Sequence, residues 1–199
     1  MKKILILLLV FSIFLIGCSE SKVPPAEDTH LIEIYKPNPE NRTELVKIAR
    51  IENASTLTTT YLTAGLINYE YGALKKAIED FDKVIAQDPK NEVAFYYRAL
   101  AKYNLSRFDD AIKDIDELVK MQPENPAVYA LRALFKYGKK DLTGALKDYD
   151  KSIELSPKNL SLYFSRADLK VELKNVNGAI EDINKVLEIN PNSAKAYIY

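Results

Sequence analysis

Hydrophobic positions recur with a period of about 34 residues from residue 58 to residue 191. Each unit carries an aromatic residue, a small residue, an alanine, a bulky apolar residue and a closing proline. In that order they are Tyr61, Phe95, Tyr129 and Tyr163; Gly65, Ala99, Ala133 and Ala167; Ala77, Ala111, Ala145 and Ala179; Phe81, Ile115, Tyr149 and Ile183; and Pro89, Pro123, Pro157 and Pro191. Apolar residues four apart on two segments predict two amphipathic helices in each unit.

The small residues allow the two helices of a unit to pack closely, while the aromatic residue fills the space beside them. We expect the first helices near 57–70, 91–104, 125–138 and 159–173. We expect the second helices near 73–87, 107–121, 141–155 and 176–189. Neither helix of a hairpin can bury its apolar residues alone, so neighbouring hairpins should stack.

This pattern closely resembles the tetratricopeptide repeat (TPR), without a gap over residues 58–191. The resemblance implies an all-α fold, a right-handed TPR superhelix (α-solenoid). It would contain four helix-turn-helix repeats at 58–91, 92–125, 126–159 and 160–193, and an incomplete fifth at 194–199. Before them, Leu45, Ile48, Ala49 and Glu52 lie on helical spacing, so we expect an N-terminal capping helix at 43–57 that covers the first repeat.

In this family, peptides bind a concave groove lined by positions 2, 5, 9 and 12 of each first helix. By this resemblance, positions 5, 9 and 12 are Leu62, Leu66 and Tyr69; Tyr96, Leu100 and Tyr103; Ala130, Leu134 and Tyr137; and Phe164, Asp168 and Val171. The lining is apolar and aromatic. It lacks the lysine, arginine and asparagine with which some family members hold the carboxylate ends of chaperone tails. The tyrosines either anchor a partner or pad the neighbouring helix.

The chain begins with Lys2, Lys3 and an apolar run over residues 4–16, which is shorter than the roughly 20 residues of a membrane-spanning helix. The run ends at Leu15-Ile16-Gly17-Cys18, and Cys18 is the sole cysteine. This end resembles the lipobox of a bacterial lipoprotein. The resemblance implies a signal peptide at 1–17 and a lipidated Cys18. The alternatives are an uncleaved anchor and an export signal with an incidental cysteine.

Residues 18–42 contain four prolines and several charges, so we expect a flexible tether after the lipidated cysteine. Several acyl chains hold a soluble domain firmly on a bilayer. We therefore expect a lipid anchor on the extracytoplasmic face of a bacterial cell membrane. Ser19 after the cysteine favours the outer membrane if the usual sorting rule applies.

The charge pattern argues against nucleic acid as a partner. The formal net charge is zero and becomes −2 once Lys2 and Lys3 leave with the signal peptide, and there is no basic block. His30 is the sole histidine and lies in the tether, so no histidine-based triad or metal cluster is expected. We expect no cofactor, no metal and no enzymatic activity.

Acidic residues gather early in one predicted helix: Asp109, Asp110, Asp114, Asp116 and Glu117. A cation site or a carboxylate pair is one interpretation. Their spacing spreads them around the helix, where early acids also favour the helix dipole, so a solvated helix is favoured.

A second charge pattern follows the repeats: Arg98, Arg132 and Arg166, and Asp80, Asp114, Asp148 and Asp182. The first repeat has the aspartate but carries Ala64 in place of the arginine. This offset favours pairs between neighbouring repeats: Asp80 with Arg98, Asp114 with Arg132 and Asp148 with Arg166. Pairing within each repeat is one alternative, and a row of solvated, unpaired charges is the other.

We therefore expect a membrane-anchored adaptor or assembly scaffold that binds a peptide or helix of another cell-envelope protein. A self-associating structural lipoprotein is the alternative, with contact through the C-terminal end, where Ile180, Ile183 and Leu187 should be poorly covered. A cell-wall hydrolase is the weakest of the three interpretations.

Overall fold

The computed structural model describes residues 56–199, so the predicted leader, Cys18, the tether and the segment 43–53 lie outside the described residues. Within residues 56–199 all regular structure is helical. The helices are α4 (Thr56–Glu70), α5 (Leu74–Gln87), α6 (Glu92–Asn104), α7 (Phe108–Met121), α8 (Pro126–Gly138), α9 (Leu142–Leu155), α10 (Leu160–Glu172), α11 (Val176–Ile189) and the short α12 (Ala194–Ile198). Each predicted helix of the four repeats is confirmed, with its ends at or next to the expected residues.

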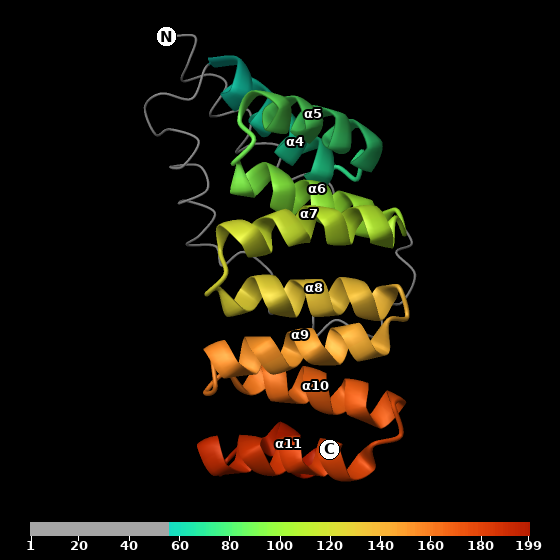
Figure 1. The fold of residues 1–199 in the computed structure, drawn as a ribbon, viewed down its shortest axis with the longest axis vertical. Helices are drawn as coiled ribbons and strands as arrows, with labels where there is room; N and C mark the ends of the chain where they lie inside the picture. Colours follow the sequence, from blue (N-terminus) through green and yellow to red (C-terminus); the bar gives the residue numbers. More distant parts are fainter. Residues whose placement is uncertain (1–55) are drawn as a thin grey trace, which may run out of the picture. The chain divides into compact units, whose positions relative to one another are not determined.

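Helices pack in chain order. α4 packs on α5, α6 on α7, α8 on α9 and α10 on α11, and each second helix also contacts the first helix of the next pair. Figure 1 shows these successive hairpins from α4 to α11. The arrangement is the predicted all-α array of paired helices.

Asparagine side chains start three of the first helices. Asn91, Asn125 and Asn159 each follow the closing proline of a repeat and accept a hydrogen bond from a backbone N–H two or three residues later. Such N-caps satisfy donors that the first helical turn leaves unpaired. The turn inside each hairpin is also alike, because Gly72, Ser106, Lys140 and Lys174 all adopt a positive φ.

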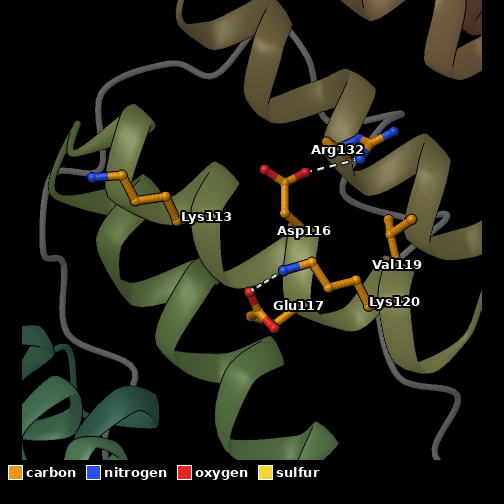
Figure 2. Close-up of a pocket in the computed structure, with 6 residues that line it drawn as sticks. All are labelled: Lys113, Asp116, Glu117, Val119, Lys120 and Arg132. Atoms are coloured by element: carbon orange, nitrogen blue, oxygen red, sulfur yellow. Dashed lines mark hydrogen bonds and ion pairs between the residues drawn. The ribbon is translucent and has the colours of Figure 1, made fainter.

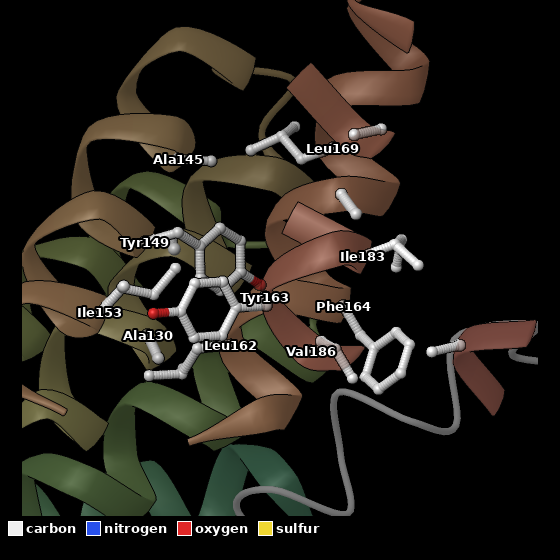
Figure 3. Packing of buried hydrophobic residues seen from close by; sticks show 14 residues of the cluster. Ala130, Ala145, Tyr149, Ile153, Leu162, Tyr163, Phe164, Leu169, Ile183 and Val186 are labelled. Carbon is white, nitrogen blue, oxygen red and sulfur yellow. The ribbon is translucent and has the colours of Figure 1, made fainter. Parts of the chain in front are cut away.

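The core lies between and within the hairpins. The alanines of the repeat pattern are nearly inaccessible to solvent, and Phe81 and Ile115 are fully buried. Around the third and fourth repeats, Tyr149 of α9 and Leu162 and Tyr163 of α10 pack together in one hydrophobic cluster (Figure 3). The Tyr163 hydroxyl donates to the Pro157 carbonyl at 3.0 Å, so the aromatic position also fastens the preceding loop.

The last hairpin is partly covered by α12. Ala196 packs with Ile183, which is buried, and Leu187 is half-buried against the same cluster. Ile180 remains 53% exposed. The expectation of poor cover is therefore confirmed for Ile180 and wrong for Ile183, because the short α12 reaches only part of α11.

Candidate peptide-binding surface

The twelve predicted groove residues, called the groove row below, differ in exposure. Four are buried: Leu62, Ala130, Leu134 and Phe164. Six are half-buried: Leu66, Tyr69, Tyr96, Leu100, Tyr103 and Tyr137. Asp168 and Val171 are exposed. The row is thus an apolar, largely packed surface in the first three repeats, and its role in binding stays a prediction.

The tyrosine rings of the row contact other helices. Tyr103 on α6 stacks on Phe135 of α8 with ring centroids 4.6 Å apart, and meets Phe108 edge-on at 5.3 Å. A Cβ on Gly138 would lie only 2.8 Å from the Tyr103 ring, so glycine makes room for it. Tyr103 therefore pads the junction between repeats 2 and 3.

Tyr69 and Tyr96 belong to a second aromatic group. Both rings meet Tyr97 edge-on, at centroid distances of 5.4 and 5.2 Å. Burial raises the pKa of both hydroxyls above the usual value. The hydroxyls therefore stay protonated at neutral pH, and this part of the row carries no charge.

The fourth repeat presents a different, polar end of the row. The Tyr199 hydroxyl donates to Asp168 Oδ1 at 2.6 Å, and Lys195 Nζ lies 4.3 Å from the centroid of the Phe164 ring. Residues at the C-terminal end of the chain thus lie over the row at repeat 4. Nothing in the sequence indicated this contact beyond the match to a fifth repeat.

Positions within a repeat are counted from its first residue, which is residue 58, 92, 126 or 160. In repeats 2 to 4 the arginine at position 7 forms an ion pair with the buried aspartate at position 23 of the same repeat. Arg132 donates to Asp148 from Nε at 2.9 Å and from Nη2 at 2.6 Å. Lys136 Nζ lies 2.7 Å from the same carboxylate. The arrangement recurs with Arg98 and Lys102 on Asp114, and with Arg166 and Lys170 on Asp182. The hydrogen bond from Arg132 to Asp148 is the main cause that raises the pKa of Arg132.

The predicted pairs between neighbouring repeats, Asp80 with Arg98, Asp114 with Arg132 and Asp148 with Arg166, are therefore wrong. The aspartate at position 23 lies against the first helix of its own hairpin, where position 7 is the nearest cation. The same arginines do cross the junctions, but to position 25: Arg98 to Asp82 at 2.6 Å, Arg132 to Asp116 at 2.8 Å and Arg166 to Asp150 at 2.7 Å. Each arginine thus joins both helices of its hairpin and the preceding repeat.

The acidic residues of α7 are individually paired with bases. Asp114 pairs with Arg98 and Lys102, and Asp116 pairs with Arg132. The exposed pairs are Asp109 with Lys139, Asp110 with Arg107, and Glu117 with Lys120. Among the described residues, no group of three or more histidine, cysteine or acidic side chains is arranged to hold a metal. The structure agrees with the interpretation of these acids as helix-surface residues, except that Asp114 is buried.

One shallow pocket lies on α7 and α8, away from the groove row. Its lining residues are Lys113, Asp116, Glu117, Val119, Lys120 and Arg132. Figure 2 shows Asp116 directed at Arg132 and Lys120 at Glu117. Asp116 pairs with Arg132, Glu117 with Lys120, and Lys113 with Asp110 outside the lining, so the pocket offers no convergent charge for a ligand.

No described helix is both long enough and apolar enough to span a bilayer. That finding concerns residues 56–199 alone. It does not bear on the predicted anchor at Cys18.

Comparison with known proteins supports the repeat assignment. Two family models described as tetratricopeptide repeat match residues 96–159 and 160–193. No curated protein matches the sequence.

Several solved structures share the fold. MamA 41-end from Desulfovibrio magneticus RS-1 is 20% identical, with a TM-score of 0.63 over 84% of this chain and 94% of that chain. A tetratricopeptide repeat protein from Parabacteroides merdae ATCC 43184 is 18% identical, with a TM-score of 0.67 over 72% and 57%. The first TPR of Spaghetti (RPAP3) bound to the HSP90 peptide SRMEEVD is 25% identical, with a TM-score of 0.55 over 62% and 98%. The chain therefore carries tetratricopeptide repeats over residues 96–193, and repeats of this class generally serve protein–protein interaction.

Proposed function

We propose that this protein is a lipid-anchored adaptor of the bacterial cell envelope, which binds an apolar peptide or helix of another envelope protein along the groove row. One observation carries the proposal: the row is uncharged through three consecutive repeats, from Leu62 to Tyr137. Half-buried Leu66, Tyr96 and Leu100 leave apolar atoms in contact with water there. Burying such a surface against a partner is favourable without any charge pairing.

The partner's chemistry follows from the same lining. The RPAP3 domain named above binds a peptide that ends in an acidic sequence. In this chain the row has no lysine, arginine or asparagine to hold a terminal carboxylate, and its one charge is Asp168. An amphipathic or apolar segment without a required free carboxylate fits this surface better than an acidic tail.

Two exposed or half-exposed row residues provide the test. Leu66→Lys and Val171→Lys place a charge on the row. Val171 is 48% exposed, so its change costs little packing, whereas Leu66 also packs on the core cluster of repeat 1 and its variant counts only if it folds. Each should weaken binding of a partner captured by in-cell cross-linking by about tenfold or more. Ile180→Lys, on α11 and outside the row, is the matched control, and circular dichroism checks folding. Full affinity in both folded row variants contradicts the proposal.

The anchor is tested separately. Cys18→Ser should release the protein from membranes or leave the precursor uncleaved, and should abolish labelling by a fatty-acid analogue. Unchanged labelling of the serine variant contradicts the lipid anchor but leaves the binding surface untouched.

A second candidate function is self-association as a structural envelope lipoprotein. It rests on Val176, Ile180 and Ile198, which are 56%, 53% and 85% exposed on α11 and α12. Cross-linking that yields only self-links, abolished by Ile180→Lys, supports this candidate over the adaptor.

A further inference from the structure

The outward side of α4 differs from the same side of the other first helices. In repeats 2 to 4, positions 3 and 10 face the preceding repeat and are buried; at position 10, Ala101, Phe135 and Leu169 are 0%, 0% and 2% exposed. In repeat 1, Thr60 at position 3 is exposed and Ile67 at position 10 is 48% exposed. Leu57 and Tyr71, on the same stripe, are 52% and 71% exposed. α4 therefore presents a junction surface that none of the described residues cover.

Position 7 shows the same difference in chemistry. At each internal junction an arginine at position 7 meets an aspartate at position 25 of the preceding repeat. In repeat 1, position 7 is Ala64, which has no charge to offer. A helix that docks here should therefore carry an apolar residue where the other repeats carry that aspartate.

The segment Thr43–Asn53, outside the described residues, meets this requirement in register. The aspartate precedes its arginine by the same sequence separation at every internal junction, as Asp82 precedes Arg98. Ile48 precedes Ala64 by that same separation. Ile51, three positions later, takes position 28, occupied in the other repeats by Ile85, Val119, Ile153 and Leu187. At position 21 the segment has Glu44 rather than an apolar residue, so the match in register rests on positions 25 and 28.

The other side of the segment is polar where a complete repeat would be apolar. Positions 20, 24 and 27 normally pack on the first helix of the same hairpin, as Ala77, Phe81 and Val84 do. In the segment these positions are Thr43, Lys47 and Arg50. The segment is thus apolar on the side that would face the next repeat. It is polar on the side that, in a complete repeat, would face the first helix of the same hairpin. This is the pattern of a single helix that caps an array.

We propose that Thr43–Asn53 docks on the outward side of α4 as a lone second helix, with Ile48 against Ala64 in place of the aspartate–arginine pair. Only residues 54 and 55 separate the segment from α4, so its effective concentration at that surface is about millimolar. A second copy of the chain at micromolar concentration competes poorly with it. This proposal does not depend on the proposed function.

The register can be tested in the full chain by a double-mutant cycle. Ile48→Asp should speed amide exchange in α4 by about tenfold, because it places a carboxylate against an apolar surface. Adding Ala64→Arg should restore slow exchange by creating the pair found at the other junctions, with a coupling of at least roughly fivefold. Since Ala64→Arg alone also gains Asp80 as a partner, the coupling and not the single effect is decisive.

Lys47→Asp is the matched control, one residue away on the polar side of the segment. It should leave α4 exchange unchanged and show no coupling to Ala64→Arg. No coupling between positions 48 and 64, or equal effects at 47 and 48, overturns the register. Protection of α4 that rises with protein concentration, together with a dimer in sedimentation, overturns the proposal in favour of a second copy.

Discussion

Repeats 1 and 3 form the same helical hairpin but neutralise the same aspartate in different ways. In repeat 3, Asp148 is 4% exposed and receives both Arg132 and Lys136. In repeat 1, Asp80 accepts from Asn68 at 2.8 Å and from Lys83 at 3.2 Å. Its side chain is 14% exposed, against 6% for Asp148.

The difference follows from the neighbours of each repeat. Arg132 also bonds Asp116 of the preceding repeat, so its charge is shared between two acids across a junction. Ala64 replaces it in repeat 1, where no described helix precedes α4. An aspartate at position 23 therefore does not require the arginine, which is found where the preceding repeat offers an aspartate at position 25.

The largest effect should come from making repeat 3 resemble repeat 1. Arg132→Ala leaves Asp148 buried with Lys136 alone and removes the bond to Asp116. Breaking a buried charge network in this way costs about 3 kcal/mol in free energy of unfolding, measured by urea titration. Because the cost comes from the stranded carboxylate, Arg132→Ala/Asp148→Asn should be more stable than Arg132→Ala.

The matched change in repeat 1 is Lys83→Ala. Its ion pair with Asp80 is exposed on the lysine side, so its loss should cost no more than about 0.5 kcal/mol. Equal losses for Arg132→Ala and Lys83→Ala contradict the comparison.

The next largest loss of stability should come from the converse substitution, which makes repeat 1 resemble the other repeats at position 8. Gly65→Ala supplies the alanine of repeats 2 to 4, but its Cβ would lie 2.6 Å from the Phe81 ring. Overpacking of this kind costs about 2 kcal/mol. Phe81→Ile, the residue type of Ile115, should recover most of that loss in the double variant. Additive losses in urea unfolding contradict a direct Gly65–Phe81 match.

The helices were predictable because propensity and periodicity agree in every repeat. A proline followed by Asn91, Asn125 or Asn159 marks the starts of α6, α8 and α10, and the constant repeat spacing determines the rest. The partners of the arginines were not predictable from spacing alone. Asp114 recurs as Asp148 and Asp182, whereas Asp116 recurs as Asp150 but is replaced by Asn184 in repeat 4. The two kinds of aspartate differ by only two positions on one helix, and one long arginine reaches both.

The groove row was predicted by register, but the packing of its rings was not. Stacking of Tyr103 on Phe135 depends on the side-chain rotamers and on the space left by Gly138. A repeat pattern gives the position of a residue on a helix and not the direction of its ring. Tyr103→Ala is therefore a poor probe of binding, since it also removes a contact between repeats.

A smaller effect concerns the turn at position 15, where repeat 1 has Gly72 and repeat 2 has Ser106. Both adopt positive φ, at 72° and 58°. A non-glycine residue is strained there, so Ser106→Gly should raise the free energy of unfolding by about 0.5–1 kcal/mol, and Gly72→Ser should lower it by a similar amount. Paired urea titrations measure both. A stabilising Gly72→Ser would contradict the shared turn geometry.

The smallest effect at neutral pH concerns position 5, where repeat 2 has Tyr96 and repeat 4 has Phe164. Burial raises the pKa of Tyr96 above its usual value near 10, so the folded state favours the neutral hydroxyl. Its contribution to stability is therefore complete below pH 10 and is lost as the pH rises further, by at most about 1.4 kcal/mol per pH unit. Tyr96→Phe removes this titration.

The measurement is the difference in free energy of unfolding between pH 7 and pH 11 for the protein and for Tyr96→Phe. The value at pH 7 accounts for any hydrogen bond that the hydroxyl makes, so only the pH-dependent part tests the prediction. The phenylalanine variant should lose less stability at pH 11. An identical alkaline loss in both proteins would show that Tyr96 ionises as readily in the fold as in the unfolded chain, and that the row at repeat 2 is open to water.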